Sequence, residues 1–150
     1  MDTIELISKN FIDENKILKD VEIIAQETGL TLFNENDPQY IALQFFKIVD
    51  NHIPFHFNLM MDGKGRFDQT KKDRDFIEEH GLIGYIYFDV EDPYLIKFLK
   101  ELLKKYPELL VYNEHGMASP TNPFVYTKAH LDVYKGVDAR LLLSHPPAKM

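Results

Sequence analysis

Two histidines four residues apart, His52 and His56 in "HIPFH", are the first residues whose types suggest metal binding. Histidines at this spacing share one face of a helix and can then ligate a single ion. Pro54, however, disfavours a helix interior, and the alternation of Phe55 and Phe57 is typical of a strand. On a strand, residues i and i+4 lie ~13 Å apart. We therefore expect no shared metal at this pair.

Two copies of "EHG", at 79–81 and 114–116, supply further carboxylates and imidazoles. Each copy lies next to a predicted strand, the first next to 82–90 and the second next to 109–113. One helix joins these two strands, so they should run in the same direction. The first copy precedes its strand and the second follows its strand. The two pairs should therefore lie at opposite ends of the sheet and not form one site.

The same topology predicts a different cluster, in which Asp89, Glu91 and His52 share one edge of the sheet. Glu114 and His115 would lie on that edge as well, some strands away. Carboxylates and a histidine in one place favour acid–base or metal chemistry. A metal-dependent hydrolase that uses His52 is therefore one alternative, although sheet edges collect polar residues whatever their function.

Other signatures of catalysis are missing from the sequence. There is no cysteine, which excludes disulfides, thiolate metal sites and cysteine nucleophiles. The "GKG" at 63–65 lacks the spacing and the Lys-Ser/Thr of a phosphate-binding loop, and neither GxSxG nor GxGxxG occurs. We therefore expect no catalytic residues and no cofactor, and a non-enzymatic protein is the favoured interpretation.

The alternating Tyr85 and Tyr87 resemble the stacking aromatics of RNA-binding sheets, but the basic residues that accompany such aromatics are absent. We interpret both tyrosines as core or interface residues, and we expect no nucleic-acid partner.

Apolar periodicity indicates which elements would position these groups. Ile17, Val21 and Ile24 form one stripe of a helix that Gly29 ends. "DTIELISKNF" before it is predicted to be a shorter helix, with Asp2 or Thr3 as its cap. The remaining predicted elements are strands at 30–33, 53–61, 82–90 and 109–113 and helices at 37–50 and 92–106.

The last two helices open on matching Asp-Pro pairs, Asp37-Pro38 and Asp92-Pro93, which are 55 residues apart. An internal duplication is one interpretation, and shared rules of helix capping are the other. In either case the order predicts an α+β fold in which N-terminal helices precede a split βαβ, ferredoxin-like βαββαβ sheet with helices on one face.

At 150 residues the chain has the usual size of one domain, and we expect a single α+β domain over 1–150. It comprises a helical part at 1–29, the βαββαβ core at 30–113 and a C-terminal extension at 114–150. In that extension "TKAHLDVYKG" predicts a short helix, and "ARLLLSH" fits a strand or a helix.

The charge is uneven along the chain. Of a net −7, residues 1–50 carry −6, from ten acids and four bases. The first ten residues include two acids and no basic segment before an apolar run, so we expect no secretory signal. No apolar run approaches the ~18 residues of a membrane span, and we expect a soluble, cytoplasmic protein. An acidic surface repels nucleic acid and favours a basic protein partner, although it also simply maintains solubility.

These observations favour a small acidic protein-binding or inhibitor protein, and an immunity or antitoxin-like protein that blocks a basic nuclease toxin is its most concrete form. The alternatives are a small-molecule-sensing regulatory module and the metal-dependent hydrolase described above. The predicted partner-binding residues lie in the N-terminal helices and the first strand–helix junction: Asp13, Glu14, Asp20, Glu22, Glu27, Glu35, Asp37 and Tyr40.

Overall fold

The computed structural model describes residues 2–8, 10, 12–36, 41–47, 52–59, 82–88, 93–113, 124–143 and 146–148. Its strands are β1 (Asp2–Ile7), β2 (Thr31–Asn36), β3 (Ile41–Lys47), β4 (His52–Leu59), β5 (Leu82–Phe88), β6 (Leu110–Asn113) and β7 (Phe124–Tyr126). Its helices are α1 (Glu14–Glu27), α3 (Leu95–Lys105), α4 (Lys128–Val133) and α5 (Ala139–Leu143).

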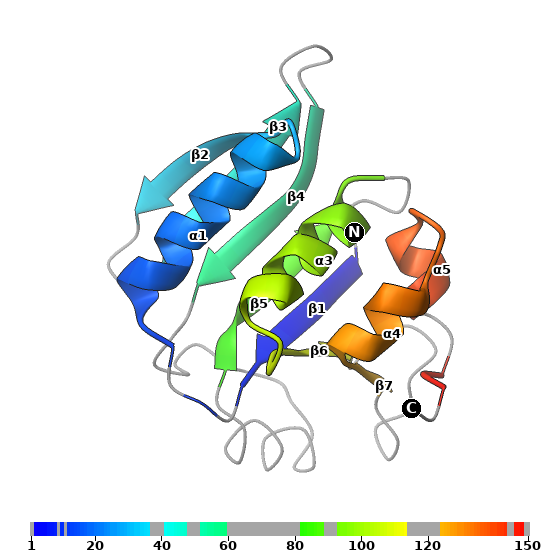
Figure 1. Ribbon diagram of the computed structural model, residues 1–150. Coiled ribbons are helices and arrows are strands. Elements are labelled where there is room, and N and C mark those ends of the chain that lie inside the picture. Colours follow the sequence, from blue (N-terminus) through cyan, green and yellow to red (C-terminus); the bar gives the residue numbers. More distant parts are fainter. Residues whose placement is uncertain are drawn as a thin grey trace.

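The seven strands form one sheet in the order β2-β3-β4-β5-β1-β6-β7, and every neighbouring pair is antiparallel. Helices α1 and α3 lie across one face of this sheet (Figure 1). The α+β class is therefore confirmed. The ferredoxin-like βαββαβ arrangement is not what these strands form, because a meander from β2 to β5 makes four of the seven strands and the N-terminal strand β1 is inserted between β5 and β6.

The prediction of a helix at the N-terminus was wrong, because residues 2–7 form the strand β1. Thr3 and Glu5 alternate with Ile4 and Leu6, which is the period of a strand. Pairing with β5 on one side and β6 on the other satisfies the backbone of β1, and such tertiary pairing overrides local capping preferences. Of the predicted helical part at 1–29, the helix α1 at 14–27 is confirmed.

The helix predicted to follow Asp37-Pro38 was also wrong, because 41–47 form β3. This strand pairs with β2 and β4 along almost its whole length. The region aligned with it 55 residues later is the helix α3. The two Asp-Pro segments therefore differ in structure, which contradicts the interpretation of an internal repeat.

The other predicted elements are present at nearly the predicted residues. Asp13 is the N-cap of α1 and accepts a hydrogen bond from Lys16 N at 3.0 Å, and Gly29 ends the helix with a φ of 75°. The N-cap of α3 is Tyr94, whose side chain makes no capping hydrogen bond, and Asp92 lies outside the described residues. In the tail, 128–133 and 139–143 are both helical.

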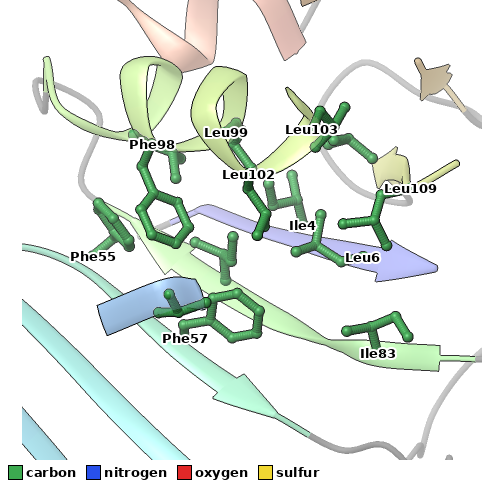
Figure 2. Packing of buried hydrophobic residues seen from close by; sticks show 14 of the residues in the cluster. Ile4, Leu6, Phe55, Phe57, Ile83, Phe98, Leu99, Leu102, Leu103 and Leu109 are labelled. Atoms are coloured by element: carbon green, nitrogen blue, oxygen red, sulfur yellow. The ribbon is translucent and has the colours of Figure 1, made fainter. Parts of the chain in front are cut away.

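The core lies between the sheet and the helices α1 and α3. Figure 2 shows the part of it that lies under α3. Phe98 of α3 packs against two phenylalanines of β4, with ring centroids 4.9 Å from Phe55 and 6.3 Å from Phe57. Ile4 and Leu6 of β1 face the same layer, and all five side chains are buried. Burial of large side chains of this kind stabilises a fold by about 1.5–3 kcal/mol each.

Specific hydrogen bonds attach the C-terminal helices to this core. Asn113 Nδ2 at the end of β6 donates to Leu143 O at 2.6 Å, and the Tyr126 hydroxyl donates to Leu142 O at 3.1 Å. From α3, Lys100 Nζ donates to Tyr134 O at 2.6 Å. The described part of the C-terminal extension is therefore joined to the sheet and to α3.

Candidate functional site

Five of the eight predicted partner-binding residues lie on or beside α1, but two of them have roles within the fold. Asp13 caps the helix, as described above. Asp20 accepts a short hydrogen bond from the Tyr106 hydroxyl at the end of α3. Lys16 Nζ lies 3.6 Å from Asp20 Oδ2 and 4.6 Å from the centroid of the Tyr106 ring. These contacts join α1 to α3, so Asp13 and Asp20 stabilise the structure that carries the remaining acids.

Burial, together with the hydrogen bond to Asp20 and the Asp20 charge, raises the pKa of Tyr106. The tyrosine side chain is only 4% exposed. Its hydroxyl therefore stays protonated and continues to donate to the carboxylate well above neutral pH. The contact is structural, and it offers no proton for chemistry near pH 7.

Glu14, Glu22 and Glu27 are exposed on α1, and they form no ion pair with the described residues. At 100° per residue Glu22 and Glu27 lie on opposite sides of the outward surface of the helix. Ile23 lies between them, and 36% of it is exposed. This part of α1, defined by Glu22, Ile23 and Glu27, is called the outer surface of α1 below.

The two sides of this surface face different elements. Glu27 lies on the side of α3, because its charge acts on Lys104 of that helix. A hydrogen bond to Glu101 and the charge of Glu101 raise the pKa of Lys104, and the charge of Glu27 adds to that increase. Glu22 lies on the side of β2, where it lines a groove. The outer surface of α1 therefore runs from α3 to the edge of the sheet.

The groove between α1 and β2 has a volume of about 350 Å³. Its lining residues come from the second half of α1, from the residue before β2 and from the first two residues of β2: Glu22, Ala25, Gln26, Leu30, Thr31 and Leu32. Three of these residues are apolar and three are polar, one of them the carboxylate of Glu22, so the groove suits a side chain that has an apolar stem and a basic end.

Of the three other predicted partner-binding residues, the structure describes only the backbone of Glu35. Glu35 belongs to β2, where its backbone is opposite Ala42 of β3. Asp37 and Tyr40 lie outside the described residues.

The sheet face opposite α1 and α3 holds a polar residue that the sequence analysis missed. Glu5 is fully buried, and the strand register places it opposite Tyr85 of β5 and Tyr112 of β6. Tyr85 and Tyr87 stack with ring centroids 6.1 Å apart, so these two tyrosines do share a face. The alternation around Glu5 could have placed it on a strand, but its burial depends on residues distant in the sequence.

A second, apolar pocket of about 470 Å³ lies in the C-terminal part. Its lining residues are Tyr126, His130, Val133, Tyr134, Leu141, Leu142, Pro146, Pro147 and Ala148. The imidazole of His130 is held at both nitrogens: Nδ1 accepts from Thr127 N at 2.9 Å, and Nε2 lies 2.6 Å from Ala148 O. Because both nitrogens are engaged, this histidine is a poor acid–base catalyst as it stands.

The predicted hydrolytic edge is not tested by the structure. Asp89, Glu91, Glu114 and His115 lie outside the described residues, and nothing is described of the His52 side chain. Among the residues that are described, no three His, Asp or Glu side chains are grouped so that they could hold a metal ion. Within the same part of the chain, no helix has the length and apolar character needed to cross a membrane.

Comparisons of the chain with protein-family models, with curated proteins and with solved structures each gave no match.

Proposed function

We propose that this chain is a non-enzymatic protein-binding protein that covers a basic surface of another protein with the outer surface of α1. One observation carries the proposal: α1 buries one side in the core and exposes Glu22 and Glu27, without ion pairs to the described residues, on a chain of net charge −7. Carboxylates in this position are available to pair with lysine or arginine of a partner.

The composition of this surface suits an interface. Ile23 supplies an exposed apolar side chain, and Glu22 and Glu27 flank it. Interfaces commonly combine a small apolar centre with a polar or charged rim. Charges in the rim increase the rate of association with an oppositely charged partner and lower it towards like-charged ones.

An inhibitor of a nucleic-acid-cleaving toxin is the most specific form of this proposal. Nucleases present positively charged clefts to phosphate, and an acidic protein competes for the same cleft. In that arrangement the chain would act as an immunity or antitoxin-like protein, and it would need no catalytic residue of its own.

The test is affinity capture from the source cells at low and at high salt, followed by mass spectrometry of the bound proteins. We expect one basic protein, bound in a stoichiometric amount at low salt and released as salt rises, because salt screens exposed charges. If the captured protein is a nuclease, its activity should fall when the purified chain is added. Capture of no basic protein, or of one whose binding does not depend on salt, would contradict the proposal.

The C-terminal pocket favours a second candidate function, the binding of a small apolar molecule. The two hydroxyl groups in its wall already donate within the protein, Tyr126 to Leu142 O and Tyr134 to Asp138 O at 2.8 Å. The pocket is therefore suited to an uncharged apolar ligand. Thermal unfolding in the presence of a panel of apolar compounds tests this candidate, with Val133→Arg as the variant that should abolish any stabilisation.

A further inference from the structure

The two edges of the sheet differ in how they are protected from pairing with another chain. At one edge β7 is three residues long, and the chain enters α4 two residues after it ends. At the other edge β2 is six residues long and pairs with β3 in continuous register, without a bulge. Among the described strands none pairs with the outer side of β2, which lies at the rim of the sheet in Figure 1.

The sequence of β2, "TLFNEN", has little of the usual protection of an edge strand. Natural edges carry charged side chains, lysine above all, or proline or bulges, or are kept short, because exposed N–H and C=O groups pair readily with another strand. The six residues of β2 include neither lysine nor proline, and their one charged residue is Glu35. Such an edge is suited to the addition of a strand.

The groove between α1 and β2 lies beside this edge. A strand added to β2 would direct every second side chain towards the side of the sheet that α1 covers. Leu30 and Leu32 form part of the groove wall, and Glu22 supplies a carboxylate at the same place. The groove can therefore take a side chain from an added strand, and Glu22 selects a basic one.

We infer that β2 is a strand-addition site, and that its occupant is an extended basic segment of the partner protein with a lysine or arginine in the groove beside Glu22. This inference rests on the proposed function, since it names the segment through which the basic partner binds. Backbone hydrogen bonds to β2 give affinity, and the groove gives specificity.

Charge argues against a second copy of this chain as the occupant. If β2 paired with β2 of another copy, the acidic margins of the two grooves, at Glu22, would come close together. Like charges that approach one another are destabilising. A basic segment instead meets Glu22 with opposite charge.

The experiment uses the full chain and a ten-residue peptide that alternates lysine and valine. A second peptide of the same sequence is N-methylated at two adjacent central residues, which blocks both edges of the extended peptide without changing its charge. A third peptide has glutamate in place of lysine. Binding is measured by fluorescence anisotropy, and amide hydrogen exchange reports on the backbone of β2.

We expect the lysine peptide to bind and to slow exchange of the outward-facing β2 amides, and the glutamate peptide not to bind. N-methylation should weaken binding by about tenfold or more, since it removes the backbone pairing. Glu22→Gln should weaken binding by about threefold to tenfold, whereas Glu101→Gln, which changes the net charge equally on α3, should alter it by less than about twofold.

Three results would overturn the inference. Equal binding of the lysine peptide and its N-methylated form, with unchanged exchange in β2, would show that charge alone attracts basic chains; the proposed function would then stand without strand addition. No binding of the lysine peptide would reject the β2 site, while salt-dependent capture of a basic protein would still support the proposed function. A dimer of the free protein with its β2 amides already protected would show that a second copy occupies the edge.

Discussion

The Tyr106 hydroxyl donates a hydrogen bond to the carboxylate of Asp20, and the two residues are 86 positions apart in the chain. The contact joins the end of α3 to the middle of α1, and Lys16 adds a contact to each of the two side chains. It fixes the orientation of α1, so that Glu22 and Glu27 face outward. In the proposed function Asp20 would therefore act on partner binding only through the structure of the helix pair.

Replacement of Tyr106 by phenylalanine should therefore destabilise the protein. The variant leaves the ring in place but removes a hydrogen bond to a charged group, which typically contributes about 1.5–3 kcal/mol to the free energy of unfolding. Urea unfolding of Tyr106→Phe, Asp20→Asn and the double variant measures the coupling between the two side chains. Glu22→Gln on the same helix is the control, with an expected change within about 0.5 kcal/mol. Additive effects of the two single substitutions would contradict this account.

Stability should fall as the pH rises above about 10, the pKa of tyrosine in an unfolded chain. Burial and the Asp20 contact raise the pKa of Tyr106 in the folded protein, and burial raises that of Tyr126. Above pH 10 the unfolded chain releases these protons while the folded chain retains them, which favours unfolding. Each tyrosine then lowers the free energy of unfolding by about 1.4 kcal/mol per pH unit.

Urea unfolding at pH 9, 10 and 11 measures this slope. Tyr126→Phe removes one of these groups, so its stability should decline less steeply than that of the wild type, whatever its stability at pH 9. Parallel declines for the two proteins would show that Tyr126 does not contribute.

Substitution by alanine should lower the free energy of unfolding by different amounts at Gly84 and at Gly29. A Cβ atom on Gly84 of β5 would collide with the carbonyl oxygen of Asn58 on β4, and that backbone cannot yield without breaking the strand pairing. At Gly29 there is open space, but the φ of 75° is unfavourable for alanine. We expect a loss of about 1 kcal/mol for Gly29→Ala and about 3 kcal/mol for Gly84→Ala. Thermal or urea unfolding gives both values, and a smaller loss at Gly84 than at Gly29 would be the contrary result.

Local sequence patterns predicted the two long helices, α1 and α3. The stripe of Ile17, Val21 and Ile24 predicted α1, and the apolar periodicity after Pro93 predicted α3, because amphipathic helices of three or more turns have a clear period. The α+β class followed from these helices and from the β-branched and aromatic strands between them.

The sheet order could not be predicted in this way, because it depends on pairing between distant segments. β1 is six residues long, too short for its alternation to exclude a helix, and its position between β5 and β6 is set by residues 75 or more positions away. The Asp-Pro pair before β3 suggested a helix cap, but pairing with β2 and β4 determines the structure of that segment.

The sequence predicted the candidate site only as a set of acidic residues. The acidic residues of α1 were identified from composition, and Glu22 and Glu27 are exposed as an interface requires. The separate role of Asp20 depends on Tyr106, and the groove beside Glu22 depends on how α1 packs against β2. Neither could be predicted from charge along the chain.

The most direct test of the central claim is the association rate of two matched double variants with the captured basic protein. Glu22→Gln with Glu27→Gln changes the outer surface of α1, and Glu101→Gln with Asp132→Asn makes the same change in charge, from −7 to −5, on α3 and α4. We predict that the α1 variant associates about tenfold more slowly at low salt and depends less on salt, while the control stays within about twofold of the wild type. Equal rates for the two variants would contradict the claim that the outer surface of α1 binds the partner.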